Sequence, residues 1–453
     1  MSNEINRLTY RASDRATKAM LTLALGYLLF GLCLGTIGGF QYILPDFLKK
    51  ELAFQKTRPL HVYLVIAWIF TCAQAAIYYY LPRVAGRPVF WIKGMWLHVF
   101  LQGVTSLIIV TCFFMGRFGG REYLEFPPWL GGFILLSWIP FAVNFWFTIK
   151  PNYKTAPVYI WMWSTGILFF FITMSESYLW IFDYFKTNIV RDVTVQWKAL
   201  GSMVGSWNML VYGTGIYVME KISGDTKTAK STTAFFFYFL GFTNLMFNWG
   251  HHTYIVPAAP WVKMTAYIIS MTELLILVRI IYLFKKTVSE AQKNFHSIPW
   301  RLLSFADFWI LLNLAFAIFL SVPAWNLYTH GTHFTVAHAM GATIGINTML
   351  LLTSVFYIIQ EEQPDWFSQN KGLIRSGIWI SNISLLAFWI SLIGSGMVRL
   401  SSKLNNELFA EMMEKSLPWF KLFAWSGTVI VVGLFLLIIP AMKALVKRKP
   451  VTV

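Results

Sequence analysis

Apolar residues recur along this 453-residue chain in long runs separated by short polar stretches. A run of about 20 apolar residues is long enough for a helix to cross the hydrocarbon core of a bilayer. Twelve runs meet this length and are predicted to be membrane spans. They cover residues 18–44, 60–82, 91–115, 128–149, 157–182, 197–219, 232–256, 261–284, 303–325, 334–359, 372–398 and 418–442. The pattern therefore predicts an all-α fold, a polytopic membrane bundle of about twelve transmembrane helices.

Composition agrees with this pattern and adds one observation. Hydrophobic residues make up 57% of the chain and charged residues only 13%, which excludes an ordinary soluble domain. Aromatic residues make up 18%, more than belts at the membrane interface require. A bundle packed around large flat ligands would explain them, and so would aromatic side chains that face lipid. Composition alone leaves both explanations open.

The net charge of +17 predicts membrane orientation rather than nucleic-acid binding. Lysine and arginine gather in short loops and in a basic C-terminal stretch, where they serve as orientation signals and contact anionic lipid headgroups. An even number of spans places both chain ends on one side. We therefore expect residues 1–17 to be a cytoplasmic N-terminus and residues 443–453 a basic cytoplasmic tail of a single domain, 1–453, without a cleaved signal peptide. The three cysteines fall in apolar spans without CxxC or zinc spacing, and are predicted to be core residues.

The predicted topology places four histidines in the outer third of the membrane: His61, His251, His252 and His338. One histidine on an apolar face is usually structural. Four histidines at one depth, on three predicted helices, favour a metal or haem site instead.

The other histidines are weaker candidates. His98 lies in the inner part of its span and His296 in a cytoplasmic loop, and neither is assigned a metal. His330 and His333 lie at the outer mouth of the tenth span, as ligands, proton carriers or solvated loop residues. The solvated alternative is favoured.

His338 and Met340 are two positions apart, and a helix turns about 100° per residue. Their side chains therefore point to opposite faces of one helix, which suits two cofactors, one on each side. Neutral imidazole binds haem iron axially, and methionine is an alternative axial ligand that raises the reduction potential. His251 and His252 are about 100° apart and converge on one metal only near a helix end or a distortion. Pro257 follows them and favours such a distortion.

Three charged residues complete the candidate chemistry. Glu273 lies halfway through the eighth predicted span, where an ionisable group needs a partner, water or a role in proton transfer. A protonated side chain bonded to a neighbouring helix is an equally good interpretation. Arg121 and Glu122 follow the third span on the outer side, where arginine pairs with carboxylates such as haem propionates. An ordinary ion pair in an outer loop is the alternative.

Together these residues resemble the large haem b subunit of bacterial nitric oxide reductase, in the haem-copper oxidase superfamily. The resemblance rests on five short motifs in the same order over almost the whole chain. They are Arg58-Pro59-Leu60-His61 with Trp68, Arg121-Glu122-Tyr123-Leu124-Glu125, His251-His252, Glu273, and Thr329-His330-Gly331-Thr332 leading to Ala337-His338.

The resemblance implies roles for these residues. His61 would ligate a low-spin haem b, His338 a high-spin haem, and His251 with His252 a non-haem iron. Glu273 would be the buried acid beside that centre.

The same resemblance implies surroundings. Arg121 and Glu122 would lie at the haem propionates, where the family also has a calcium site. The implied partners are a membrane-anchored c-type cytochrome or quinol as electron donor, in the bacterial cytoplasmic membrane. No CxxCH motif for covalent haem c is present, so electrons must come from such a donor.

Two departures from the family pattern change the expected activity. Leu200 and Val204 stand where the family has a histidine and a glutamate for the non-haem iron, and apolar side chains cannot bind such a metal. Met340 stands where the family has the second histidine of the low-spin haem, a role that methionine can take.

Three function classes follow from these observations. The first is a haem oxidoreductase that passes electrons through b haems, to nitric oxide or another small diatomic. The second is a diverged, non-catalytic haem protein that relays electrons, senses a gas or scaffolds a complex. The third, a transporter without cofactor, fits least well, because only Glu273 is predicted near the midplane. An optical spectrum separates the third class from the first two.

Overall fold

A computed structural model describes the backbone of residues 2–447 and the side chains of residues 10–272, 285–286 and 288–447. The sixteen α-helices in this described part are α1 (Ser2–Phe40), α2 (Phe54–Ala85), α3 (Ile92–Phe114), α4 (Trp129–Ile149), α5 (Val158–Glu176), α6 (Asp183–Lys186), α7 (Ile189–Ser223), α8 (Thr232–Phe247), α9 (Pro260–Thr287), α10 (Glu290–Phe295), α11 (Ser297–Ser321), α12 (Pro323–Thr329), α13 (His333–Met340), α14 (Met349–Glu362), α15 (Pro364–Leu404) and α16 (Phe409–Val446). Short 3₁₀ helices are η1 (Leu179–Ile181), η2 (Thr228–Lys230) and η3 (Asn248–Thr253), and η4 (Gly341–Thr348) is a π-helix.

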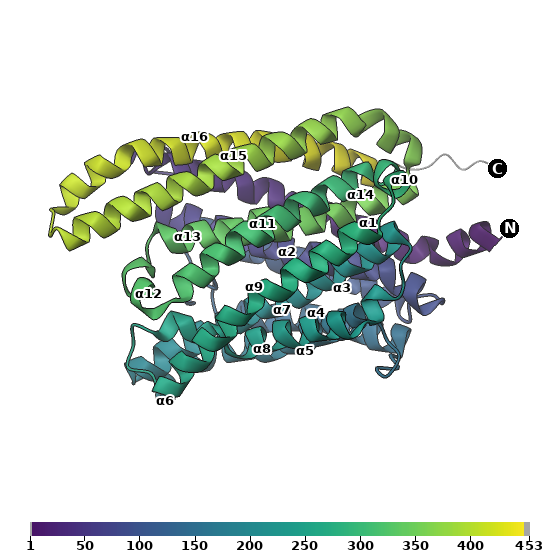
Figure 1. Cartoon of the computed structure of the whole chain (residues 1–453), viewed down its shortest axis with the longest axis horizontal. Coiled ribbons are helices and arrows are strands. Elements are labelled where there is room, and N and C mark those ends of the chain that lie inside the picture. Colours follow the sequence, from purple (N-terminus) through teal and green to yellow (C-terminus); the bar gives the residue numbers. More distant parts are fainter. Residues whose placement is uncertain (1, 448–453) are drawn as a thin grey trace.

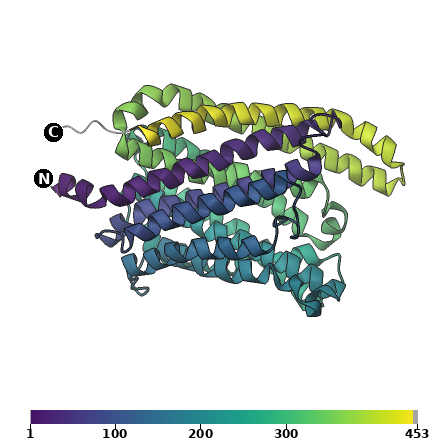
Figure 2. The same ribbon diagram turned by 180° about the vertical axis from the view of Figure 1, so that it is seen from behind.

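The all-α prediction is confirmed, and every predicted span coincides with a helix or with helices that follow one another closely. Nine of the described helical stretches are long and apolar enough by themselves to cross a membrane. Helices α7, α8 and α9 are not among these nine, although they lie in the same bundle (Figure 1). The start of α1 and the end of α16 lie at the same end of the bundle, as an even number of spans predicts (Figures 1 and 2).

Helix α2 and the continuous stretch from α13 through η4 to α14 form the centre of the bundle. In its most apolar window α2 is 78% buried, and the stretch His333–Glu362 is 83% buried, whereas the other seven candidate spans range from 39% to 56%. Since almost every side chain of these two elements is apolar or small, burial on all sides is what their composition predicts. They hold His61, His338 and Met340.

The last two long helices form an antiparallel hairpin on one side of the bundle. At 41 residues, α15 is about 61 Å long at the helical rise of 1.5 Å per residue, twice the thickness of a bilayer core. The tip of the hairpin extends beyond the other helices at the end away from the chain termini (Figure 1). Leu408 and Phe409 at this tip are 69% and 74% exposed.

Two local features of the sequence show directly in the fold. The helix that precedes the adjacent histidines ends at Phe247, and the chain then tightens into η3, so the distortion predicted at His251 and His252 is confirmed. The three cysteines are free, and Cys72 and Cys112 are buried. Cys33 is exposed, so its assignment to the core was wrong, because it lies on the outward face of α1.

Candidate functional site

His61 lies two turns into α2 with one ring nitrogen already engaged. Its Nδ1 is 2.7 Å from the carbonyl oxygen of Gly31 on α1. A Cβ on Gly35 would come within 2.7 Å of the His61 ring, so only glycine allows α1 to pass this close. When Nδ1–H donates to a carbonyl, the tautomer is fixed and Nε2 keeps its lone pair. The ring is therefore held in the form and orientation of an axial haem ligand.

His338 on α13 differs from His61 in its bonding. Its Nδ1 is buried near Asn313 of α11 and makes no hydrogen bond within the described part of the chain. Helix α11 approaches closely here, since a Cβ on Gly341 would come within 2.4 Å of the Asn313 side chain.

Met340 is the last residue of α13, directly before the π-helix η4. It is partly buried against the main hydrophobic core. Met340 stands where the family has the second histidine of the low-spin haem, so its Sδ would be the second axial ligand, opposite His61. A π-helix of eight residues is unusually long, and such segments occur frequently at functional sites.

His251 and His252 lie side by side in η3, with ring centroids 4.2 Å apart. His251 Nδ1 is 3.0 Å from Asn248 Oδ1, which also accepts a hydrogen bond from Ser270. The His252 ring stacks on Trp197 of α7, with centroids 4.5 Å apart and planes 9° apart. The structure thus brings the two predicted metal ligands together.

His330 joins this pair, which the sequence did not indicate. Its Nε2 is 3.2 Å from His252 Nδ1, and it also contacts the Trp197 ring. Burial lowers the pKa of His330 below its ordinary value, and the nearby Glu122 carboxylate raises it in part. The favoured interpretation of His330 as a solvated loop residue was therefore wrong, because the turn after α12 folds back onto η3.

His333 does not belong to this cluster. It lies among the rings of Tyr42 and Phe420, which come from the loop after α1 and from α16. His330 and His333, three positions apart, therefore lie in different surroundings.

Leu200 and Val204 lie on α7, which packs against η3 closely enough that a Cβ on Gly201 would be 2.6 Å from the Trp249 side chain. Leu200 is 9% exposed and belongs to the main hydrophobic core, and Val204 is 38% exposed. Among the described side chains no group of three or more histidines, cysteines or carboxylates lies close enough together to hold a metal ion. The donor set around η3 does not fit the family's non-haem iron.

Arg121, Glu122 and Glu125 in the loop after α3 take part in ion pairs. Arg121 pairs with Asp192 at 2.7 Å. Arg58, one turn before His61, pairs with Glu122 at 2.7 Å and with Glu125 at 2.8 Å. Arg58 is thus the cation nearest to His61 in sequence. Its position one helical turn before His61 could have identified it as a residue of the candidate site.

The predicted buried acid, Glu273, lies on α9, but its side chain falls outside the described residues. Its role stays a prediction.

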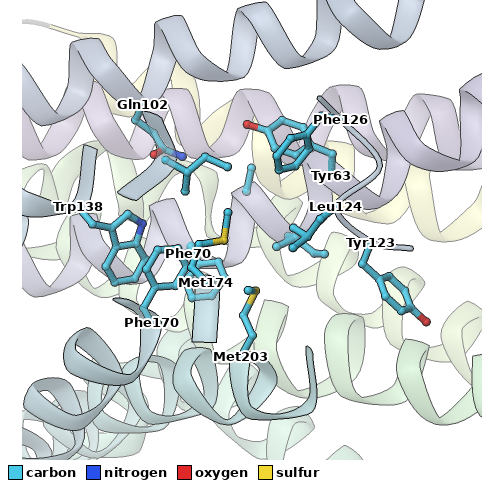
Figure 3. A pocket seen from close by; sticks show the side chains of 13 residues that line it. Tyr63, Phe70, Gln102, Tyr123, Leu124, Phe126, Trp138, Phe170, Met174 and Met203 are labelled. Carbon is cyan, nitrogen blue, oxygen red and sulfur yellow. The ribbon is translucent and has the colours of Figure 1, made fainter. Parts of the chain in front are cut away.

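A small cavity of about 50 Å³ lies between α2, α3, α4, α5 and α7, beneath the loop that carries Tyr123 and Leu124 (Figure 3). Rings such as Phe70, Trp138 and Phe170 line it, with Gln102 at one end. A water molecule needs about 10–15 Å³ of such volume, so the cavity has room for a few water-sized molecules.

Comparison with known proteins identifies a family that matches almost the whole chain. The sequence profile of the family described as Cytochrome C and Quinol oxidase polypeptide I matches residues 15–442.

Two relatives come from Stutzerimonas stutzeri. One is a subunit of nitric oxide reductase, 24% identical over 84% of this chain and 82% of the relative. The other is the cbb3-type cytochrome c oxidase subunit CcoN1, 20% identical over 95% of this chain and 94% of the relative.

A solved structure of a heme-copper terminal oxidase dimer shares the fold. It aligns with a TM-score of 0.71 at 12% identity and covers 97% of this chain and 85% of that chain.

Proposed function

The chain belongs to the cytochrome c and quinol oxidase polypeptide I family, and on this premise we propose that it carries electrons through b haems near the outer membrane face without reducing nitric oxide. The observation that supports this best is a contrast within one site. His61, His338 and Met340 are present, with His61 Nδ1 held by the Gly31 carbonyl, whereas Leu200 and Val204 stand where the family has two ligands of the distal metal.

We place the proposed low-spin haem between α2 and α13. His61 would hold it through Nε2, because the Gly31 carbonyl holds Nδ1, and Met340 would be the second ligand. A haem bound there supplies a one-electron redox centre, and a methionine ligand raises its potential relative to two histidines. The surrounding glycines and the core side chains of α2 keep the two ligands in place and exclude water.

His338 provides the ligand for a second, high-spin haem on the other face of α13. With one axial position taken by the protein, the other remains for a small diatomic. Binding or relay at this centre, rather than turnover, is the proposed outcome.

Reduction of two nitric oxide molecules to nitrous oxide needs two metal centres side by side. The distal histidines cannot supply the second centre alone, because Leu200 and Val204 leave α7 without the two ligands that the family has at these positions. Activity as a nitric oxide reductase is the second candidate function, since the relative with 24% identity carries that name. It would require Glu273 or His330 to rebuild the site.

Electrons reach the proposed haem from the outer side, from a membrane-anchored c-type cytochrome or from quinol. The docking region is the loop with Arg121 and Glu122, whose charges lie at the outer end of α2 and α7. Arg58 pairs with one carboxylate oxygen of Glu122. We therefore propose haem as the cofactor and keep a calcium ion at this loop only as what the family resemblance implies.

One experiment tests the proposal in three parts. The protein is purified from membranes, its optical spectrum recorded, and haem and non-haem iron are counted. We expect b-type haem with a low-spin component, less than one non-haem iron per two haems, and negligible nitric oxide consumption with reduced donor. A spectrum without haem contradicts the haem assignment, and rapid nitric oxide consumption with a full complement of non-haem iron contradicts the loss of the distal metal.

A further inference from the structure

The π-helix η4 contains one threonine whose hydrogen bonding differs from that of its neighbours. Thr343 and Thr353 each donate from Oγ1 to the carbonyl four residues earlier, at 2.8 Å, as threonines in α-helices do. Thr348 donates instead to the carbonyl of Thr343, five residues earlier, also at 2.8 Å. This bond has the i−5 spacing of a π-helix and supports that spacing over the ordinary α spacing.

The same hydroxyl connects the π-helix to α2. Trp68 Nε1 donates to Thr348 Oγ1 at 3.2 Å, and both side chains are buried, at 1% and 3% exposure. A buried indole N–H needs an acceptor, because an unpaired one loses its hydration without compensation. The Thr348 hydroxyl therefore accepts one bond and donates another, and links two helices.

These helices are the ones that carry the proposed axial ligands of the low-spin haem. Trp68 follows His61 by seven residues, so both side chains lie on the same face of α2. Thr348 follows Met340 by eight residues, at the far end of η4. The Trp68–Thr348 bond thus fixes α2 against η4, two turns along α2 from His61 and at the other end of η4 from Met340.

We propose that Thr348 is a positioning residue for the low-spin haem: its two hydrogen bonds hold the π-helical register and the spacing from α2 that bring Met340 to the haem opposite His61. The proposal rests on the proposed function, because it needs a haem with these two ligands. Thr348 itself touches neither the haem nor the substrate.

The test compares matched variants of the purified, haem-loaded protein. Thr348→Val keeps the size and branching of the side chain and removes both hydrogen bonds. It should reduce the low-spin fraction at least twofold in the optical and electron paramagnetic resonance spectra. It should also let added imidazole or carbon monoxide bind the haem that is low-spin in the native protein. Thr348→Ser keeps the hydroxyl and should restore the native spectra.

Thr353→Val is the matched control, since Thr353 is also buried on the same helical stretch and makes an ordinary i−4 bond. It should leave the low-spin fraction unchanged. Native spectra in Thr348→Val, or equal losses in Thr348→Val and Thr353→Val, would overturn the proposal.

A second variant covers the case in which Thr348→Val does not accumulate. Trp68→Phe keeps an aromatic ring and removes the N–H donor, and a native low-spin spectrum in this variant would then overturn the proposal. The proposed function fails in a different way, because the unaltered protein would then lack a low-spin haem altogether.

Discussion

Two regions of the bundle differ in how firmly they are packed. The α2 and α13–α14 pair carries the proposed haem ligands and is buried over 78% and 83% of its apolar windows. In the α8–η3–α9 region, which carries His251 and His252, α8 buries only Ala234 and Leu245. Dense packing orients single side chains. The proposed haem ligands thus lie in the densely packed region, and the proposed metal ligands His251 and His252 lie in the loosely packed one.

The largest expected effect tests the rigid region. His61→Ala should abolish the low-spin haem signal, because Met340 alone does not hold the iron in a six-coordinate state. Optical and electron paramagnetic resonance spectra of the purified variant measure this. His296→Gln, at the junction of α10 and α11, is the control and should keep the signal. An unchanged low-spin spectrum in His61→Ala would contradict the assignment of His61 as a haem ligand.

The second test rebuilds the loose region. Leu200→His with Val204→Glu restores the two ligand types on α7, and we expect non-haem metal to rise severalfold, toward one per protein. Metal analysis after haem quantification measures it, and either single change provides the control. No rise in a folded, haem-loaded double variant would mean that the α7 and η3 backbones do not present the ligands to one point.

A smaller effect tests how close α1 must come to His61. The Cβ of Gly35→Ala would lie 2.7 Å from the His61 ring, so the variant should lose part of its low-spin haem. Overpacking of this kind costs about 1–3 kcal/mol of stability. Gly26→Ala on the same helix meets nothing within 4 Å and should leave haem and stability as they are. Equal haem content in the two variants would show that the Gly35 contact does not position the ring.

The smallest expected effect is a change of the Tm with pH, caused by His296 next to α14. Burial lowers the pKa of His296 from its ordinary 6.5, while Gln360 and Glu361 on α14 raise it in part. A pKa below the unfolded value means that the folded state prefers the neutral ring. Stability is therefore complete above pH 6.5 and decreases as the pH falls below it. The Tm should be lower at about pH 5 than at about pH 7, and His296→Gln should narrow that difference. If the Tm difference between the two pH values is the same in the variant, groups other than His296 cause it.

The sequence predicted the twelve helices because span length and apolarity are local properties that the bilayer imposes. It also predicted the distortion at His251 and His252, since Pro257 and the 100° step per residue are visible in the chain. It did not predict that His330 would bond to His252, because this contact depends on how the turn after α12 folds over η3. The ion pairs of Arg58 and the stacking of Trp197 depend equally on contacts between distant segments. The π-helix has no sequence signal comparable to a proline.

The α15–α16 hairpin has a steric consequence for any redox partner. Its tip extends beyond the other helices at the end of the bundle away from the chain termini (Figure 1). A folded domain that docked on this end from the hairpin side would meet the tip first. If a redox partner docks there, the length of one hairpin restricts the directions from which it can approach.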